Sequence, residues 1–220
     1  MRRFYRAGIL PSLVNLITGL MRVPGRSSEY GIKRGYKSRL ENDFFDDTVL
    51  QDEYQREVYE FAESLFRRQN LKEVIDVGCG SGYKLRKHFQ PQEATGYDLE
   101  PTVGHLRRNY PDWTWFHADQ LKHRSKSDLI ICADVIEHLT DPTPLLVQFQ
   151  SIQFQYLIIS TPDRHQKTGR WDFGPPFNPA HVREWNQAEL KSFLGHFFRI
   201  ENHFLSNVQQ GTQLILCRPY

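Results

Sequence analysis

The sequence predicts an α/β domain whose seven-stranded sheet is mostly parallel and ends with an antiparallel strand. Three observations lead to this prediction. Short β-prone runs alternate with helical stretches from residue 48 onward, which is the pattern of strand–helix–strand units. The first run leads into a loop with alternating glycines at residues 78, 80 and 82. The last two runs are separated by Gln209, Gln210 and Gly211, a connection too short for a parallel crossover.

The expected elements follow one another along residues 48–218. A first helix over 48–68 carries Val58, Phe61, Ala62 and Leu65 on one face, because side chains three and four apart share a side of a helix. Strands are expected at 73–77, 93–98, 113–117, 128–133, 155–160, 197–205 and 212–218. Helices are expected between them at 82–89, 101–109, 142–151 and 187–194. The loop over 161–177 is long and rich in proline and glycine, which predicts a segment that covers a substrate.

The composition indicates one domain without a strong charge. With 220 residues and 39% hydrophobic side chains, the chain is long enough to bury a core. Its formal net charge of +2 gives no strong field toward nucleic acid or anionic lipid, which favours a small-molecule acceptor without excluding polymeric anions. Cys79, Cys132 and Cys217 form no Cys-x-x-Cys pair. This pattern fits a reducing cytoplasm and disfavours a zinc site built on thiolates.

The first 45 residues are expected to be an extension to the domain at residues 46–220. The apolar run Ile9–Met21 is interrupted by polar residues and proline and is too short to span a bilayer. Its leucines and isoleucine recur at helical spacing, so residues 4–23 predict an amphipathic helix that lies either on a membrane surface or on the domain itself. The aromatic, basic and glycine residues of Tyr30–Arg39 fit either a lid over the substrate or a solvated connector.

The glycine loop predicts a cofactor site at the carboxyl end of the first strand. Asp76 closes the first β-prone run, and Gly78, Gly80 and Gly82 follow before a helix begins. Glycine accepts positive φ and lets the backbone approach a ligand closely, and the helix directs its free amides into the same crevice. Asp98 ends the second run, 22 residues after Asp76, where an acid holds the ribose of a nucleoside.

These residues resemble those of the class I S-adenosylmethionine-dependent methyltransferases, in the group of types 11 and 12. The motif Asp-x-Gly-x-Gly-x-Gly at 76–82 differs from the Gly-x-Gly-x-x-Gly of nicotinamide binders. Asp98, the run 116–119 and the run 129–139 also match, and the resemblance covers residues 50–218. It implies S-adenosylmethionine as the cofactor and a Rossmann-like fold. In that fold the strand order is 3-2-1-4-5-7-6, strand 7 is reversed and helices cover both faces of the sheet.

The resemblance also implies how the cofactor is held. The backbone of Gly78, Cys79 and Gly80 would meet its amino-acid moiety, and Asp76 would orient the loop or reach the ammonium through water, unless it only caps the loop. Asp98 would accept from both ribose hydroxyls, because a carboxylate at a strand end is a ready bidentate acceptor.

Asp119 would accept from the adenine amine, beside Gln120 and Leu121, unless it only caps a helix. Trp113 and Trp115 fit core or edge positions better than an adenine platform. The full set of expected cofactor contacts is Asp76, Gly78, Cys79, Gly80, Gly82, Asp98, Leu99, Asp119, Gln120, Ala133 and Asp134.

The expected catalytic residues are Glu137, His138 and His181. The first two follow the fourth strand, and His181 follows the loop rich in proline and glycine. A sulfonium already carries a good leaving group, so alignment is the main task. A hydroxyl acceptor must also lose its proton to a base or bind a metal. His138 is the candidate base.

A metal is a second interpretation of the same residues. Asp134, Glu137, His138 and His181 resemble the Glu-x-x-Glu-His and distant His of RNA 3′-terminal 2′-O-methyltransferases, where acids and imidazoles hold magnesium. Ubiquinone-pathway O-methyltransferases share part of the pattern. Asp134 replaces the first glutamate and has a shorter reach. Pro142 indicates a helix start nearby, so a structural role in a connecting turn is the third interpretation.

The sequence therefore predicts a methyltransferase that uses S-adenosylmethionine and acts on a hydroxyl of a small polar metabolite or a sugar. Two alternatives from other classes stay open. One is an RNA 3′-terminal 2′-O-methyltransferase with a metal site. The other is a non-catalytic partner subunit that binds the cofactor or a membrane.

Overall fold

A computed structural model describes residues 29–41, 43 and 48–220 of the chain. The helix expected within residues 4–23 and most of the 1–45 extension lie outside the described residues. Among the helices that are described, none combines the length and the hydrophobicity needed to cross a bilayer.

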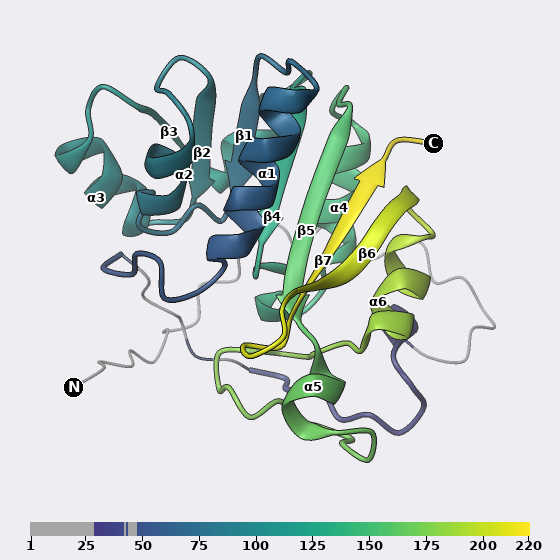
Figure 1. The fold of residues 1–220 in the computed structure, drawn as a ribbon. Helices are drawn as coiled ribbons and strands as arrows, with labels where there is room; N and C mark the ends of the chain where they lie inside the picture. Colours follow the sequence, from purple (N-terminus) through teal and green to yellow (C-terminus); the bar gives the residue numbers. More distant parts are fainter. Residues whose placement is uncertain (1–28, 42, 44–47) are drawn as a thin grey trace.

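One sheet organises the fold, with the strand order β3-β2-β1-β4-β5-β7-β6 (Figure 1). Its strands β1 to β5 are parallel, so that Val74 of β1 lies beside Ala94 of β2 and Leu129 of β4. β7 runs antiparallel to both β5 and β6. The order and the reversed last strand confirm the predicted topology. The strand bounds are β1 (Val74–Val77), β2 (Ala94–Asp98), β3 (Thr114–His117), β4 (Leu129–Ala133), β5 (Tyr156–Pro162), β6 (Arg199–Asn207) and β7 (Thr212–Arg218).

Helices cover both faces of the sheet, as predicted. Figure 1 shows α1 in front of the sheet and α4 behind it. The helices of the first face are α1 (Arg56–Arg68), α2 (Tyr83–His88) and α3 (Thr102–Asn109), and those of the second are α4 (Thr143–Gln150) and α6 (Gln187–Leu194). Neighbouring strand residues alternate between the two faces. Ile131 packs in the apolar cluster under α1, α2 and α3, and Ile130 packs in the cluster under α4 and α6. The core is therefore two apolar layers separated by the sheet.

The helix predicted over 48–68 is wrong at its amino end. It begins at Arg56 because Gln55 has a left-handed backbone with φ 64°, and residues 48–54 form turns, bends and irregular backbone. A side chain competes with helical bonding in that stretch, since the Glu53 carboxylate accepts from the Gln51 amide at 2.6 Å. The other predicted strands and helices begin and end within two residues of their expected positions. The side chains that α1 buries are Val58, Tyr59, Ala62, Leu65 and Phe66.

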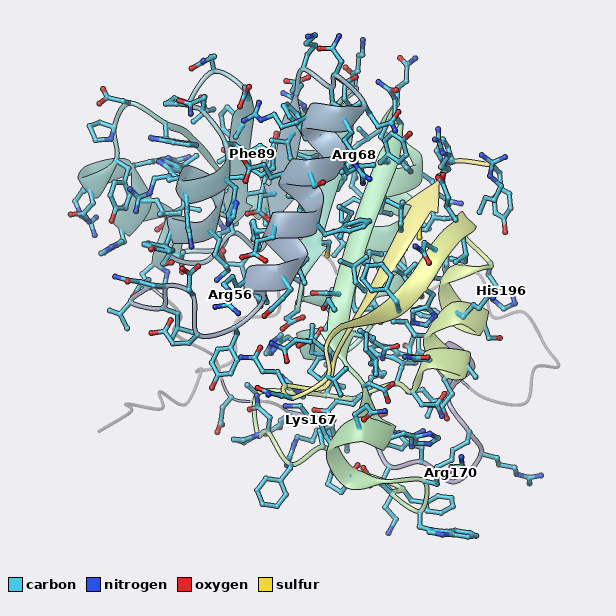
Figure 2. All side chains as sticks on the ribbon, in the orientation of Figure 1. Arg56, Arg68, Phe89, Lys167, Arg170 and His196 are labelled. Carbon is cyan, nitrogen blue, oxygen red and sulfur yellow. The ribbon has the colours of Figure 1, made fainter. Side chains whose placement is uncertain are left out.

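The carboxyl ends of the parallel strands point toward α5 (Arg164–Thr168) and the segment 29–41 (Figure 1). Figure 2 shows Lys167 and Arg170 at this same end of the molecule, away from Arg68 and Phe89. The predicted 161–177 loop thus contains a short helix, whose amides at positions 165 and 166 donate to the Asp163 carboxylate. This end of the sheet is where open α/β folds bind ligands.

Candidate active site

The loop after β1 is shaped so tightly that glycine is required at two positions. Gly78 has φ +80°, and a Cβ there would lie 2.3 Å from the Cγ2 atom of Val135. Gly82 has φ +64°, and its Cβ would lie 2.7 Å from the ring of Trp115 and 2.9 Å from Leu106. L-residues rarely adopt such φ values. The glycines therefore fix the path of the loop between β1, α3 and β3, and Trp115 is a buried packing residue as predicted.

Asp98 is connected to this loop at the end of β2. Its Oδ2 atom accepts from the Gly80 amide and its Oδ1 atom from the Leu99 amide, both at 2.7 Å. Burial raises the pKa of Asp98, while these two amide bonds lower it. Each carboxylate oxygen accepts more than one hydrogen bond, so both oxygens keep capacity for the two hydroxyls of a ribose.

Asp76 and Cys79 lie beneath the loop surface. The Asp76 side chain is fully buried and accepts from the Tyr59 hydroxyl at 2.8 Å. That bond joins β1 to α1 and fits the loop-orienting role expected for this acid. Cys79 is also buried, and its Sγ atom would lie 2.8 Å from a Cβ at position 96. Its side chain packs inward, which leaves only its backbone for a ligand.

Asp119 and Gln120 are exposed at the start of the 3-10 helix η4 (Ala118–His123). Here the cap is His117, whose Nδ1 atom accepts from the Asp119 amide at 3.2 Å. The Gln120 side chain accepts from the His117 amide at 3.2 Å. The alternative that Asp119 caps this helix is therefore wrong. Its carboxylate is 66% exposed, and its Oδ2 atom lies 3.4 Å from the Nδ1 atom of His117.

A second group of polar residues follows β4. Asp134 has a left-handed backbone with φ 53°, a conformation that costs a non-glycine residue roughly 1 to 2 kcal/mol. Its amide donates to the Ser160 carbonyl at 3.0 Å, and the Ser160 hydroxyl donates to its carboxylate at 2.6 Å. Asp134 is thus held against β5. The preceding Ala133 is buried, and its carbonyl accepts from Gln55.

Glu137, His138 and His181 come together in the structure. One nitrogen or oxygen of each lies within 4.8 Å of the others, and the two imidazole rings meet edge to face with centroids 4.7 Å apart. The first two belong to the 3-10 helix η5 (Ile136–His138), and the third to the loop after α5. The Glu137 carbonyl accepts from the Val182 amide at 2.7 Å, which holds the two segments together. Asp134 does not join this group.

Glu137 is a buried carboxylate without hydrogen bonds of normal geometry. Neither of its oxygens has a hydrogen bond of normal geometry among the described residues, and the side chain is fully buried. Burial raises the pKa of Glu137 well above its usual range and the Asp134 charge raises it further, while the amide of Glu137 itself and the nearby Thr161 hydroxyl oppose the shift. Such a group is costly unless a proton or a cation neutralises it.

The two histidines are held through their Nδ1 atoms. His138 donates from Nδ1 to the Ala180 carbonyl at 2.8 Å. In His181, Nδ1 lies 2.6 Å from Glu184 Oε1, and Nε2 lies 3.0 Å from the Asn178 amide nitrogen. Burial, and then the neighbouring His181, lower the pKa of His138 to about 4. With its proton on Nδ1, His138 carries its lone pair on Nε2 and is neutral at pH 7, whereas Nε2 of His181 already contacts Asn178.

The donor set fits a divalent cation. One carboxylate and two imidazoles are ligands that transition metals accept readily, and the Glu137 oxygens would gain a partner. A cation on His181 would take the place of the Asn178 hydrogen bond. Asp134 is committed to Ser160, so only three of the four residues in the sequence pattern are grouped.

Sequence reasoning missed several residues of this site. Glu184 and Asn178 contact His181, and Tyr36 contacts Glu184. The spacing of three between His181 and Glu184 is the signal that could have found the first pair. No sequence pattern indicates the contact of Tyr36, because 148 residues separate it from Glu184.

Comparisons with known proteins agree with this geometry. A family model described as a methyltransferase domain matches residues 48–201. A probable S-adenosylmethionine-dependent methyltransferase of Mycolicibacterium smegmatis is 33% identical over 134 residues, 56% of this chain and 50% of that protein. The small RNA 2′-O-methyltransferase of Mus musculus is 26% identical over 186 residues, 70% of this chain and 45% of that protein. The chain thus spans about half the length of these curated relatives.

A solved structure has the same fold. The magnesium protoporphyrin IX methyltransferase of Synechocystis PCC 6803, with bound S-adenosylhomocysteine, superposes with a TM-score of 0.58 at 19% identity. The match covers 76% of this chain and 84% of that one. At this identity the likeness concerns the fold alone.

Proposed function

Because the chain belongs to the class I S-adenosylmethionine-dependent methyltransferase family, we propose that it methylates a hydroxyl of a small polar metabolite or a sugar. The observation that carries this proposal is the gathering of Glu137, His138 and His181 within 4.8 Å at the carboxyl end of the sheet. A neutral amine or a thiolate can attack a sulfonium without such a group. A hydroxyl needs help to lose its proton, which is the task that this cluster suits.

The cofactor half of the reaction is assigned to the first two strands and η4. Asp98 accepts from the ribose hydroxyls, and the loop backbone from Gly78 to Gly82 lies against the amino-acid moiety. Asp119 and Gln120 face the adenine, and Ala133 and Asp134 border the cofactor at the end of β4. Asp76 acts from beneath, since its bond to Tyr59 holds the loop in place. These residues align the methyl carbon for attack.

The acceptor hydroxyl must lose its proton, and two explanations are compared. Glu137, His138 and His181 fit the role of metal ligands better than His138 alone fits the role of a base. A base works best when its pKa lies near the working pH, whereas the pKa of His138 is about 4. A neutral imidazole is, however, ready to bind a metal. When bound, a divalent cation would lower the pKa of the acceptor hydroxyl. Two imidazoles favour manganese, iron, cobalt or zinc over magnesium, which prefers oxygen ligands.

A second candidate is 2′-O-methylation of an RNA 3′ end. The cluster of one acid and two histidines matches the metal-binding pattern of those enzymes in three of four positions, and the mouse small RNA 2′-O-methyltransferase is among the relatives. The fourth position is Asp134, whose carboxylate bonds to Ser160. RNA therefore stands second to a small acceptor.

Transfer of a labelled methyl group separates these candidates. The full chain is incubated with labelled S-adenosylmethionine and either sugars and polar metabolites or an oligoribonucleotide, with a 3′-terminal 2′-deoxy oligomer as the control. Labelling of small hydroxyl acceptors supports the proposal. Labelling of RNA that disappears with the 2′-deoxy end favours the second candidate. Cofactor binding without transfer to either class would leave the non-catalytic partner subunit as the explanation.

The same assay decides between metal and base. With a metal, chelator abolishes turnover, manganese restores it, and His138→Ala and His181→Ala both lower turnover by roughly 10²- to 10⁴-fold. With a base, only His138→Ala has this effect and chelator has none. Full activity of both variants would leave alignment as the source of the rate.

A further inference from the structure

The segment 29–41 precedes the matched family region but lies on the loop that carries His181. The Lys37 amide donates to the Phe173 carbonyl and the Arg39 amide to the Val182 carbonyl, both at 2.8 Å. Figure 1 shows this segment beside α5 at the carboxyl end of the sheet. The segment is therefore a neighbour of the candidate active site rather than a separate connector.

Tyr36 is the side chain of this segment that reaches toward the site. Its hydroxyl oxygen accepts from the Glu184 amide at 3.1 Å. Its ring stacks with the buried guanidinium of Arg164, whose centre lies 4.8 Å from the ring centroid. Burial raises the pKa of Tyr36 to about 12, so the phenol keeps its proton. Arg164 is anchored in turn by two bonds to the Glu189 carboxylate, at 2.6 and 2.7 Å.

Glu184 connects Tyr36 to His181. The Glu184 side chain is buried, and its Oε1 atom lies 2.6 Å from the Nδ1 atom of His181. A carboxylate in this place accepts the Nδ1 proton, which fixes the tautomer with a lone pair on Nε2. The Asn178 amide group is 3.0 Å from that Nε2 atom, and it donates only if the lone pair is there. The two contacts agree on one tautomer.

We propose that Glu184 is a positioning residue that keeps the proton of His181 on Nδ1, and that Tyr36 holds the Glu184 backbone in place for this task. The inference rests on the proposed function, because it gives His181 a ligand or acceptor role at Nε2. It also makes part of the amino-terminal extension a component of the site.

The test measures the tautomer first and metal binding second. Nitrogen-15 spectra of the full chain, labelled at histidine and recorded at pH 8, identify the protonated nitrogen of His181. Titration with manganese alone, followed by electron paramagnetic resonance, gives the metal affinity. The variants are Glu184→Leu, Glu184→Gln and Tyr36→Phe. The control is Glu63→Gln, because Glu63 bonds to His88 at 2.7 Å in a similar pair outside the site.

In Glu184→Leu we expect His181 to lose its Nδ1 preference and manganese affinity to fall roughly 10- to 100-fold, the usual scale for a partner behind a metal-binding histidine. Glu184→Gln keeps an acceptor oxygen and should retain most of both. Tyr36→Phe should weaken manganese binding by less, roughly 2- to 10-fold for one neutral hydrogen bond. Glu63→Gln should change neither quantity.

Affinity for S-adenosylhomocysteine, measured on every variant, shows that the domain is folded. An unchanged His181 tautomer in Glu184→Leu would overturn the inference, whatever the metal affinity. If the tautomer shifts in Glu184→Leu but the wild-type chain does not bind manganese, the positioning role is supported and the metal in the proposed function is not. If Glu184→Leu does not fold, the wild-type spectrum and Tyr36→Phe carry the test: a wild-type His181 protonated on Nε2 would overturn the role of Glu184, and unchanged manganese affinity in Tyr36→Phe would overturn the role of Tyr36.

Discussion

The two halves of the candidate site differ in how the protein satisfies its own buried acids. On the cofactor side, both Asp98 oxygens accept backbone amides and Asp76 accepts from Tyr59. On the acceptor side, neither oxygen of Glu137 has a donor of normal geometry in the described chain. The first half is thus held in shape by its own bonds. The second retains an electrostatic cost that a bound cation or proton would relieve.

The largest expected effect tests the rigidity of the cofactor half. Gly78→Ala places a Cβ 2.3 Å from Val135 at φ +80°, which combines overpacking with backbone strain. We expect a loss of about 2 to 5 kcal/mol in the free energy of unfolding, measured in urea. The control is Gly169→Ala, which has φ +85°, ψ 176° and open space around its Cβ, so that it adds backbone strain without overpacking and should lose about 1 to 3 kcal/mol. Equal losses would mean that the contact with Val135 is not tight.

The next effect concerns ribose binding by the same half. Asp98→Ala removes the acceptor from both ribose hydroxyls and leaves the Gly80 and Leu99 amides without their partner. Calorimetry should show a loss of roughly 1 to 3 kcal/mol in S-adenosylhomocysteine binding. Asp112→Ala, an exposed acid before β3, serves as the control and should bind normally. Unchanged affinity in the Asp98 variant would remove the ribose assignment.

A smaller effect concerns the electrostatic cost of the buried Glu137 on the acceptor side, which the pH dependence of the free energy of unfolding tests. The folded-state pKa of Glu137 is raised above its usual value. The protonated carboxyl therefore contributes its full stability to the fold below about pH 4.5. This stability is lost as pH rises from there through the folded-state pKa, because the unfolded chain ionises first. Glu137→Gln cannot ionise, so the metal-free variant should be more stable than wild type at pH 8 by roughly 1 to 3 kcal/mol.

This gain should shrink toward pH 4.5, and manganese should stabilise the wild type but not the variant. The low pKa of His138 acts in the opposite direction, since stability from the neutral ring is lost as pH falls from 6.5 toward 4. Both proteins contain His138, so its contribution cancels when the free energy of unfolding of the wild type is subtracted from that of Glu137→Gln. Parallel pH curves for the two proteins would contradict the idea of an unrelieved buried acid.

The smallest effect concerns the loop that covers the acceptor half. Residues 180–185 are buried, whereas Trp171 and Phe177 are about 90% exposed. Hydrogen exchange should therefore already be slow near 180–185, and slowing on addition of cofactor plus acceptor should concentrate at 165–179. Cofactor alone should give less protection. Equal protection in both states would indicate a fixed structural loop.

The sequence predicts the cofactor half more completely than the acceptor half for a physical reason. The glycine loop and Asp98 act through local backbone chemistry, which a motif records directly. The strand order is implied by the family resemblance that this motif carries, and the short turn before β7 predicts the antiparallel pairing of the last two strands. By contrast, the left-handed Gln55 that delays α1 and the Asp134–Ser160 bond depend on contacts between segments. No periodicity in the chain encodes them.

The acceptor half shows the same limit within one short run. His181 stands out as a ligand or base by its chemistry alone. Glu184, three residues later, is an ordinary acid until the fold brings Tyr36 to its amide. The role of Glu184 behind His181 thus depends on contacts between segments that are distant in the chain. The sequence shows each segment but does not show that they are in contact.

The position of β7 has a consequence for how the chain is made. Thr212–Arg218 forms an interior strand, with β5 on one side and β6 on the other. A ribosome delivers β5 and β6 first, so the edge of β5, whose residues are all buried in the finished sheet, stays unpaired until residue 218 has emerged. Open apolar edges pair readily with other chains. The edge of β5 is therefore protected from aggregation only when β7 has been made, and we expect the nascent chain to depend on a chaperone until then.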